Sequence, residues 1–375
     1  MNYRKLMWVL FVLLFIFLAV FLSIKLNPAF GGKATGDRLE LMIQSPNFSD
    51  GKFQNPVETV MQTDDMPFFK LMKEFFFTKG DRVPADTIPV IPLNPENYSE
   101  RTGPARMTWL GHSSVLIEIS GKTILTDPVF GKRISPFSFI GTKAFAYSHS
   151  YKLTDLPPVD LVLISHDHYD HLDYSVIKQL VNTDVPFVTA LGVGAHLEYW
   201  GISPERITEL DWWESYILDD VLLFTATPAR HFSGRGLTNR FSTLWASWVI
   251  ESRDERLFFG ADSGYYPGFK EIGDKFGHFD LVMLECGQYS RYWPFIHMSP
   301  EETVRAALDL NAKALLPIHW GKYKLSIHPW TEPVERLLKA AEGSPIQVTT
   351  PKIGEVFTLD KRLPDSRWWR EDGKN

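Results

Sequence analysis

"ISHDHYDHLD", residues 164–173, brings three histidines and three aspartates together within ten positions. The apolar run "VDLVLI" at residues 159–164 leads into it and predicts a buried strand that ends where the polar cluster begins. Ionisable side chains at this density are costly to keep together unless they find partners or a metal ion. We therefore expect a metal site at the end of this strand, and a solvated polar loop is the alternative.

The spacing within the cluster is H-x-H-x-D-H. Residues two apart in an extended chain point to the same side, so the imidazoles of His166 and His168 can reach one ion. Asp170 and His171 follow once the chain has turned, and they can reach a second ion nearby. The pattern therefore favours a metal site over isolated structural histidines.

This pattern at a strand end resembles the hallmark of the metallo-β-lactamase fold superfamily. The resemblance implies three further ligands downstream, in the order histidine, aspartate, histidine. The sequence supplies His231 in "PARHFSGRG", Asp262 in "FFGADSGY" and His319 in "LLPIHWG", each after an apolar run. It also implies an α+β fold, an αββα sandwich of four layers.

Carried over to this sequence, the resemblance implies two divalent ions that share one carboxylate. The first ion would be held by His166, His168 and His231, the second by Asp170, His171 and His319, and Asp262 would bridge them. Imidazole and carboxylate ligands suit zinc, with manganese or iron as alternatives. Two close cations lower the pKa of a shared water, so that hydroxide is present near neutral pH.

The single cysteine narrows the kind of metal site and the branch of the superfamily further. Cys286 excludes an intramolecular disulfide and a zinc cage of thiolates. Many true β-lactamases place a cysteine at the second metal, whereas "GADSG" offers Asp262, as in the hydrolase and phosphodiesterase branches. Cys286 lies in the apolar run "LVMLECG" and is expected to be buried and structural.

Further stretches resemble one family, the N-acyl-phosphatidylethanolamine-hydrolysing phospholipases D. They are "TWLGHSSVLIEI", "TDPVF", "HFSGRG", "TLWASWVI" and "GADSGY", within a similarity that extends over residues 27–359. The ascorbate-6-phosphate lactonase group shares only the short "WLGHSS" type of motif. The resemblance implies a phosphodiesterase that acts on (N-acyl) glycerophospholipids. A hydrolase of a soluble phosphodiester, phosphate ester or lactone is the alternative, and a non-catalytic metal-binding membrane adaptor is a remote one.

His297 in "FIHMSPEE" corresponds to a further active-site histidine of that family. It lies just before an expected helix start, where partial positive charge favours a nearby anion. We expect it to stabilise phosphoryl oxygens or to protonate the leaving group, and a surface histidine without a role is the alternative. Asp170 and His297 are thus the predicted catalytic residues.

Other polar residues near the predicted ligands are expected to support them. Asp127 in "TDPVF" is expected to hydrogen-bond a ligating histidine. His112 is a second supporting candidate or a structural turn residue, and Arg235 pairs either with phosphate or with a structural acid. Asp167 alternates away from the two histidines, and Asp173 is expected to cap the next helix.

The N-terminus predicts a membrane anchor. Residues 6–22 are wholly apolar, and residues 23–24 extend the run to a length that reaches across about 30 Å of hydrocarbon. A cleaved signal peptide is disfavoured, because the run exceeds the usual apolar region and no A-x-A-like site follows. Arg4 and Lys5 favour an inside N-terminus and an extracytoplasmic body, although Lys25, Lys33 and Arg38 follow the span.

Four segments are expected: an anchor at residues 1–26, a mostly irregular arm at 27–105, a catalytic domain at 106–360 and a tail at 361–375. Within the arm, "DDMPFFKLMKEFFF" at residues 64–77 predicts a helix whose apolar stripe covers the core or faces a membrane. From residue 107 two batches of strands, each mixed with helices, predict two packed sheets with helices outside. "SPEETVRAALDLN" carries a capping box at Ser299 and Glu302.

Composition is that of an ordinary globular protein of 375 residues, with a formal charge of −6. No long basic run is present, so a nucleic-acid partner is not supported. The expected partners are a lipid bilayer and a small-molecule or phospholipid substrate.

Overall fold

The computed structural model describes residues 3–63, 68–77, 80–94, 98, 103–236 and 238–370. Its α-helices are α1 (Tyr3–Leu26), α2 (Gly36–Gln44), α3 (Phe68–Phe77), α4 (Tyr174–Ile177), α5 (Gly194–Tyr199), α6 (Gly268–Phe276), α7 (Pro300–Asp309) and α8 (Glu332–Ala341). Short 3₁₀ helices are η1 (Pro28–Phe30), η3 (Leu153–Asp155), η4 (Lys178–Leu180), η5 (Pro204–Arg206) and η6 (Trp368–Arg370).

Two seven-stranded sheets form the centre of the molecule. The first runs in the order β10 (Ile207–Leu210), β9 (Phe187–Ala190), β8 (Leu161–Ile164), β5 (Lys122–Thr126), β4 (Val115–Ile119), β3 (Arg106–Trp109), β18 (Val356–Thr358). The second runs in the order β11 (Ser215–Leu218), β12 (Leu222–Thr227), β13 (Ser247–Glu251), β14 (Arg256–Ala261), β15 (Phe279–Glu285), β16 (Ala312–Ile318), β17 (Gln347–Val348). Two hairpins lie outside them: β1 (Phe48–Ser49) with β2 (Lys52–Phe53), and β6 (Arg133–Ile134) with β7 (Thr142–Lys143).

The two sheets share one topology. In the first, β18, β3, β4 and β5 are antiparallel neighbours, and β8, β9 and β10 then continue parallel to β5. In the second, β11 to β14 are antiparallel, and β15, β16 and β17 continue parallel to β14. The pairing changes from antiparallel to parallel at β5 in one sheet and at β14 in the other, so these two strands occupy equivalent positions. Asp127 and Asp262 each follow the corresponding strand.

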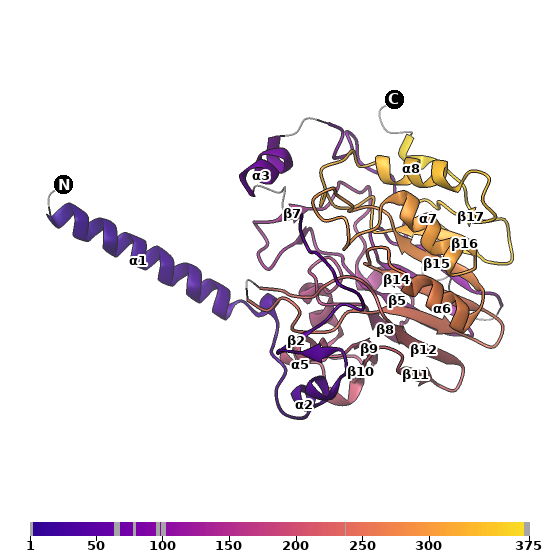
Figure 1. Ribbon diagram of the computed structural model, residues 1–375, viewed down its shortest axis with the longest axis horizontal. Coiled ribbons are helices and arrows are strands. Elements are labelled where there is room, and N and C mark those ends of the chain that lie inside the picture. The colour runs from indigo at the N-terminus through magenta and orange to yellow at the C-terminus, as the bar shows by residue number, and fades with distance from the viewer. Residues whose placement is uncertain are drawn as a thin grey trace.

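The central strands are buried on both faces. Every residue of β4 and β8 is buried, as are five consecutive residues of β15 and of β16. Such strands need a cover on each side, which the partner sheet and the helices provide. Helix α7 packs on β15 and β16, α5 packs beside β10, and α6, α7 and α8 lie along the outer side of the second sheet (Figure 1). The predicted α+β class with two packed sheets is confirmed.

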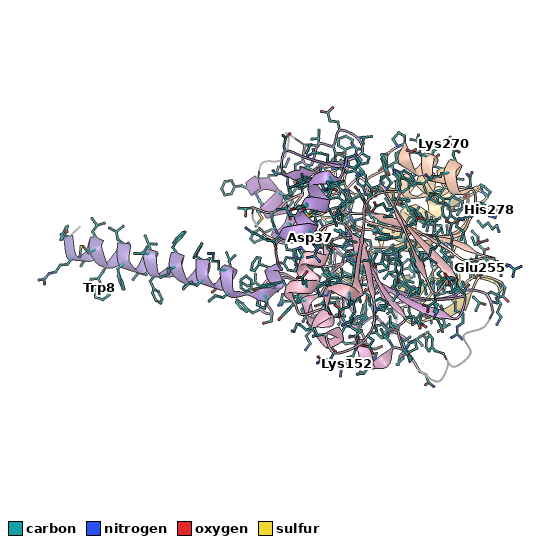
Figure 2. All side chains as sticks on the ribbon, turned by 90° about the horizontal axis from the view of Figure 1, so that it is seen from below. Trp8, Asp37, Lys152, Glu255, Lys270 and His278 are labelled. Carbon is teal, nitrogen blue, oxygen red and sulfur yellow. The ribbon has the colours of Figure 1, made fainter. Side chains whose placement is uncertain are left out.

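Helix α1 extends away from the rest of the molecule (Figure 1), and its apolar side chains, Trp8 among them, point outward in every direction (Figure 2). By length and composition it is able to cross a membrane. None of its residues is buried. At ~1.5 Å per residue its length exceeds the ~30 Å hydrocarbon core.

The segment at residues 27–105 lies on the body through specific polar contacts. Asn55 Nδ2 donates to the carbonyl oxygen of His231 at 2.8 Å, and Arg38 pairs with Glu198 at 2.7 Å and with Glu209. It also contains α2, which was not predicted: its apolar residues Leu39, Leu41 and Ile43 alternate along the sequence instead of forming a helical stripe, and all three are exposed. The four segment boundaries proposed above stay a prediction.

Helix α3 forms where the stripe at residues 64–77 predicts a helix, although Asp65 and Pro67 at its expected start lie outside the described residues. Phe75 is half-buried beneath Arg82, whose guanidinium carbon lies 5.1 Å from the ring centroid. The opposite side bears Phe69 and Phe77, which are 85% and 77% exposed. One side of α3 therefore packs on the body, and the other side faces outward.

Most strands and helices of the catalytic part occur where the sequence predicts them, including the capping box of α7 at Ser299 and Glu302. Strands β10 and β11 and helix α6 were not predicted. Residues of β10 are mostly half-buried, and the first three residues of β11 are alternately exposed and half-buried. Edge strands of this kind carry a weaker apolar pattern than central ones.

Candidate metal centre

The strand β8 ends at Ile164 and delivers the opening cluster to one edge of the first sheet. His166 Nε2 lies 2.9 Å from His168 Nδ1, and His231 Nε2 lies 3.3 Å from the same atom. Asp262 Oδ2 lies 3.6 Å from His231 Nε2 and 4.0 Å from His166 Nε2. Three imidazole nitrogens and one carboxylate oxygen thus converge within 4.8 Å of one another.

A second set of donors lies on the other side of Asp262. His171 Nε2 is 3.7 Å from Asp170 Oδ2 and 3.2 Å from Asp262 Oδ2. His319 Nδ1 is 3.0 Å from Asp262 Oδ1. This set also contains His112, whose Nε2 lies 2.9 Å from Asp170 Oδ2. The structure therefore brings together all seven residues that the sequence proposes as ligands, and it adds His112 beside Asp170.

Hydrogen bonds outside the centre fix the orientation of three histidines. His171 Nδ1 donates to Asp127 Oδ2 at 2.7 Å, and His231 Nδ1 donates to the carbonyl oxygen of Ile296 at 2.9 Å. His166 Nδ1 lies 2.9 Å from Ser165 Oγ, which donates to Asp127 Oδ2 at 2.6 Å. With Nδ1 engaged outside, each ring presents Nε2 to the centre, which is the usual arrangement for ligating histidines.

The protonation states also suit metal ions. Burial lowers the pKa of His166, His231 and His319 well below the ordinary value, and it lowers the pKa of His168 to about 4. These imidazoles are therefore neutral at pH 7 and keep a lone pair for a cation. His171 differs: burial lowers its pKa, but the carboxylates of Asp262 and Asp170 raise it well above the ordinary value. A cation in this position would replace that proton.

Several buried polar atoms of the centre lack partners. Within the described chain, His171 Nε2, Asp262 Oδ1 and His319 Nε2 make no well-formed hydrogen bond. Burial also raises the pKa of Asp262 to about 6. Buried polar groups without partners are costly, and two divalent cations would satisfy these atoms. The residues thus fit two ions with nitrogen and oxygen ligands; the identity of the metal stays a prediction.

Cys286 is not part of the donor set. It is fully buried, and burial raises the pKa of its thiol well above the ordinary value. A protonated thiol in apolar surroundings is an inert packing residue. The centre therefore consists of imidazoles and carboxylates.

The backbone at the centre is unusual. His112, Asp127, Ala261 and His319 all have positive φ angles, of 56°, 35°, 47° and 63°. Residues other than glycine rarely adopt this conformation, which costs of order 1–3 kcal/mol each unless the surroundings impose it. Ala261 is the last residue of β14 and the other three lie one to three residues after a strand, so these four strained residues lie at the ends of strands that deliver donors.

Besides Ser165, two further supporting residues were missed by the sequence reading. Ser113 Oγ lies 3.0 Å from His319 Nδ1 and so orients this ring. Glu285 Oε2 accepts a hydrogen bond from His297 Nδ1 at 2.6 Å. Glu285 is fully buried at the end of β15, and burial raises its pKa well above the ordinary value. It follows the apolar run "LVML", in which an isolated acid gives no signal of its target.

His297 itself faces the cavity that leads to the donors. Its ring centroid lies 5.0 Å from that of His231 and 5.3 Å from that of His319. Its side chain is 13% exposed, like that of Asp170 at 14%, whereas most donors are almost completely buried. The two residues proposed as catalytic therefore have access to a bound molecule.

Arg235 has a different environment from the one that a phosphate partner would need. It is buried, and it donates to the carbonyl oxygens of Ala29 at 3.0 Å, Asp167 at 2.6 Å and Leu172 at 2.9 Å. Its guanidinium also lies over the ring of Tyr169. These contacts hold residues 167–172 and the segment after α1 together, so Nε and Nη1 of Arg235 bind the protein itself, while Nη2 is buried without a partner among the described residues.

Replacing Arg235 with methionine is expected to lower the free energy of unfolding by about 2–4 kcal/mol, because three buried carbonyl groups lose a charged donor. Chemical denaturation of the detergent-solubilised full chain measures it. Arg253→Met serves as the control, since Arg253 is exposed in the turn between β13 and β14. Equal stability of the two variants would contradict the structural role of Arg235.

The two remaining aspartates of the opening cluster lie outside the centre. Asp173 caps α4 by accepting a hydrogen bond from the Ser175 amide at 2.8 Å, which confirms the predicted cap. Asp167 accepts from the Gly234 amide at 2.6 Å and from His196 Nε2 at 3.1 Å. Both carboxylates order the loops around the centre.

A cavity of about 270 Å³ opens above the donors. Its polar floor is formed by His168, Asp170, His231, Asp262, His297 and His319, and its walls include Met61, Phe232, Trp293, Ile296, Leu325 and Arg240. A mostly apolar wall around a polar floor is typical of small-molecule sites.

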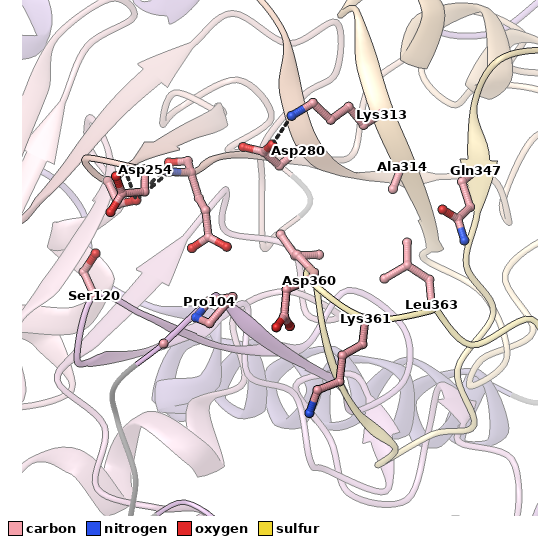
Figure 3. A pocket seen from close by; sticks show the side chains of 14 residues that line it. Pro104, Ser120, Asp254, Asp280, Lys313, Ala314, Gln347, Asp360, Lys361 and Leu363 are labelled. Atoms are coloured by element: carbon pink, nitrogen blue, oxygen red, sulfur yellow. Dashed lines mark hydrogen bonds and ion pairs between the residues drawn. The ribbon is translucent and has the colours of Figure 1, made fainter.

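A larger hollow, of about 640 Å³, lies elsewhere. It is lined by charged side chains such as Asp280, Lys313 and Asp360 (Figure 3). Asp280 and Lys313 stand at the beginning of β15 and β16, whereas the metal donors follow the ends of such strands. A strand of seven residues spans roughly 20 Å, so this hollow lies at the opposite edge of the sheet and is unrelated to the centre.

Comparison with known proteins places these features in a class. Residues 122–320 match the model of the Beta-lactamase superfamily domain. A protein of Mycobacterium tuberculosis described as uncharacterized is 43% identical over 332 residues, which cover 87% of this chain and 88% of that one. N-acyl-phosphatidylethanolamine-hydrolyzing phospholipase D 1 of Caenorhabditis elegans is 31% identical over 308 residues, which cover 76% of this chain and 86% of that one.

Solved structures agree on the fold. A metallo hydrolase of Ignicoccus hospitalis superposes with a TM-score of 0.53 at 20% identity, over 69% of this chain and 100% of that one. Isothiocyanate hydrolase from Delia radicum gut bacteria gives the same TM-score and identity, over 68% and 98% of the two chains.

The chain therefore belongs to the beta-lactamase superfamily, the class that its two sheets and its strand-end histidines define. Within that superfamily it is a homologue of the N-acyl-phosphatidylethanolamine-hydrolysing phospholipases D. The fold, the candidate metal centre and these relatives support a metal-dependent hydrolase.

Proposed function

We propose that this protein is a membrane-anchored phosphodiesterase of the phospholipase D type, which hydrolyses (N-acyl) glycerophospholipids. The proposal is supported above all by the convergence of the seven donors beneath a cavity that His297 also lines. The name of the relative in C. elegans supports the substrate class.

The ligand assignment that we propose follows the geometry of the two donor sets. His166, His168 and His231 would hold one divalent ion, Asp170, His171 and His319 the other, and Asp262 both. Zinc is the proposed metal. When bound, two such ions supply Lewis acidity to a phosphoryl group and lower the pKa of water.

The protein's own residues would then bind, orient and protonate. Ser113, Asp127 and Ser165 hold the imidazoles in place through the hydrogen bonds described above. His297, held by Glu285 through Nδ1, presents Nε2 to the cavity and would donate a proton to the departing alcohol. The apolar wall would accept lipid chains and exclude water from the reacting atoms.

A substrate panel tests the proposal on the purified, metal-loaded full chain. N-acyl-phosphatidylethanolamine in mixed micelles is expected to yield phosphatidic acid and N-acylethanolamine, with slower turnover of soluble diesters. Exclusive turnover of a soluble lactone or phosphate monoester, with no release from micelles, would refute the lipid assignment. Full metal content without hydrolysis of any ester would favour a binding protein instead.

We propose that α1 is an uncleaved signal anchor and that the body lies outside the cytoplasm. An outer membrane protein of Klebsiella pneumoniae, RomA, is 52% identical over 103 residues, which cover 28% of this chain and 77% of that one. The exposed side of α3, with Phe69 and Phe77, is proposed to meet the same bilayer.

Removal of residues 1–26 is expected to release the protein from the membrane fraction while its turnover of a soluble diester stays unchanged. Turnover of vesicle lipid should fall by about 10²-fold at low enzyme concentration, because the anchor raises the effective concentration of enzyme at the surface. Sedimentation and paired assays measure both effects. An equal fall on soluble and vesicle substrates would mean that α1 supports the fold rather than the location.

A further inference from the structure

The wall of the cavity above the metal centre contains one cationic side chain among the described residues, Arg240. Arg240 is exposed, and its guanidinium carbon lies 4.7 Å from the centroid of the Phe232 ring. The Phe232 ring in turn lies 4.4 Å from the ring of His168. One aromatic ring therefore separates a permanent positive charge from a proposed metal ligand.

The hydrogen-bonding capacity of Arg240 is unused. In the part of the chain that the structure describes, its side chain makes no hydrogen bond or ion pair, and its guanidinium contacts the Phe232 ring. A guanidinium that stacks through its flat face keeps the N–H groups along its edge for a ligand. Arg235, the arginine that the sequence suggested for phosphate, donates to buried carbonyl oxygens through Nε and Nη1, and its buried Nη2 has no partner among the described residues.

The loop that carries Arg240 is held in place at its base. Ser233 Oγ donates to the carbonyl oxygen of Thr243 at 2.6 Å, and the Phe241 amide donates to the carbonyl oxygen of Ser233 at 3.0 Å. A Cβ at Gly234 would lie 3.0 Å from the Arg240 Cα, so glycine permits the close approach of the two strands of the loop. Arg240 thus lies next to the anchored base of this loop.

We propose that Arg240 determines substrate specificity by binding a non-bridging oxygen of the substrate phosphate, so that the cavity selects anionic phosphodiesters over neutral esters and lactones. This inference rests on the phosphodiesterase function proposed above. A diester monoanion has two non-bridging oxygens, and only one of them needs to face the metal centre. Arginine matches the other by its planar fork of donors, and a neutral ester offers no such oxygen.

The test uses three full-length variants: Arg240→Met, Arg240→Lys, and Arg253→Met as a matched control. Arg253 is an exposed arginine at the opposite edge of the second sheet. Its replacement changes the net charge by the same amount as Arg240→Met, but at a distance from the cavity. The substrates are bis(p-nitrophenyl) phosphate, N-acyl-phosphatidylethanolamine in mixed micelles, and the neutral ester p-nitrophenyl butyrate. Inorganic phosphate serves as a competitive inhibitor, which gives a readout of binding separate from turnover.

Arg240→Met is expected to raise the KM for both anionic substrates and the inhibition constant of phosphate by about 10- to 100-fold, as for the loss of a charged hydrogen bond. The kcat, the metal content and turnover of the neutral ester should stay at wild-type levels. Arg240→Lys should recover part of the affinity, because it keeps the charge and loses the fork. Arg253→Met should behave as wild type.

Unchanged KM and phosphate inhibition in Arg240→Met would overturn the inference, as would an equal rise in KM for the neutral ester. A change on micelles alone would also overturn it, because Arg240 would then meet the lipid surface rather than the reacting phosphate. Failure of the proposed function gives a different result: the wild type itself would not hydrolyse either diester. The inhibition of p-nitrophenyl butyrate turnover by phosphate then decides alone. If Arg240→Met leaves this inhibition constant unchanged, the role of Arg240 is rejected.

Discussion

Replacing Asp262 with asparagine is expected to remove bound metal and to lower turnover of a phosphodiester by about 10³-fold or more, since metal ions contribute several kcal/mol to such reactions. The Asp262 carboxylate lies within reach of both donor sets, 3.6 Å from His231 Nε2 and 3.2 Å from His171 Nε2. A neutral amide in this position supplies no charge to offset two cations. Elemental analysis of the purified protein, together with steady-state rates, measures both losses.

Measuring the melting temperature in the presence of a chelator distinguishes loss of metal and turnover from unfolding of the variant. Without metal, burial penalises the Asp262 carboxylate and raises its pKa to about 6, so an uncharged amide is expected to melt at the same temperature or higher at pH 7. Asp254→Asn, an exposed change in the turn between β13 and β14, is the control. Two ions per chain and wild-type rates in Asp262→Asn would refute the shared-ligand assignment.

Replacing His297 with glutamine is expected to lower turnover by about 10²- to 10⁴-fold for diesters with an alcohol leaving group, the range found for the loss of a general acid. Nitrophenolate departs without a proton, so bis(p-nitrophenyl) phosphate should lose far less. The comparison of the two substrates therefore reports on proton donation rather than on binding. Metal content should stay at the wild-type level.

Glu285→Gln is expected to give the same dependence on the leaving group, with losses of about 10- to 100-fold, the range for residues that hold a functional histidine from behind. The amide fills the buried site, but unlike the carboxyl group of Glu285 it cannot take up or release a proton beside His297. The control is His278→Gln, a change at the exposed histidine labelled in Figure 2, and it should leave the turnover of both substrates unchanged. Equal losses on both substrates would show that Glu285 and His297 maintain the cavity instead of moving a proton.

Much of the fold could be predicted because its central strands are buried on both faces and therefore read as continuous apolar runs. The H-x-H-x-D-H cluster was equally visible, since four donors lie within six positions of one strand end. Glu285 was not, because its partner His297 is distant in sequence and an acid after an apolar run has no local signature. Ser113 was hidden in the same way, since its role depends on His319, which belongs to the other sheet.

Arg235 and Arg240 show the same limit from another direction. Both lie in one loop, and from the sequence we named Arg235, not Arg240, as a candidate partner of phosphate. Packing distinguishes the two arginines: Arg235 is buried among carbonyl groups, whereas Arg240 lies in the cavity wall. A sequence shows which residues are charged, but the direction in which a charged side chain points depends on long-range contacts.

The equivalent positions of β5 and β14 in two sheets of the same topology have a consequence for how the protein matures. His166 follows a strand of the first sheet, whereas Asp262 and His319 follow strands of the second. The donor sets are therefore complete only after both halves have been synthesised and have closed on each other. We therefore expect full metal occupancy only in the completely folded chain, after the two sheets have packed together.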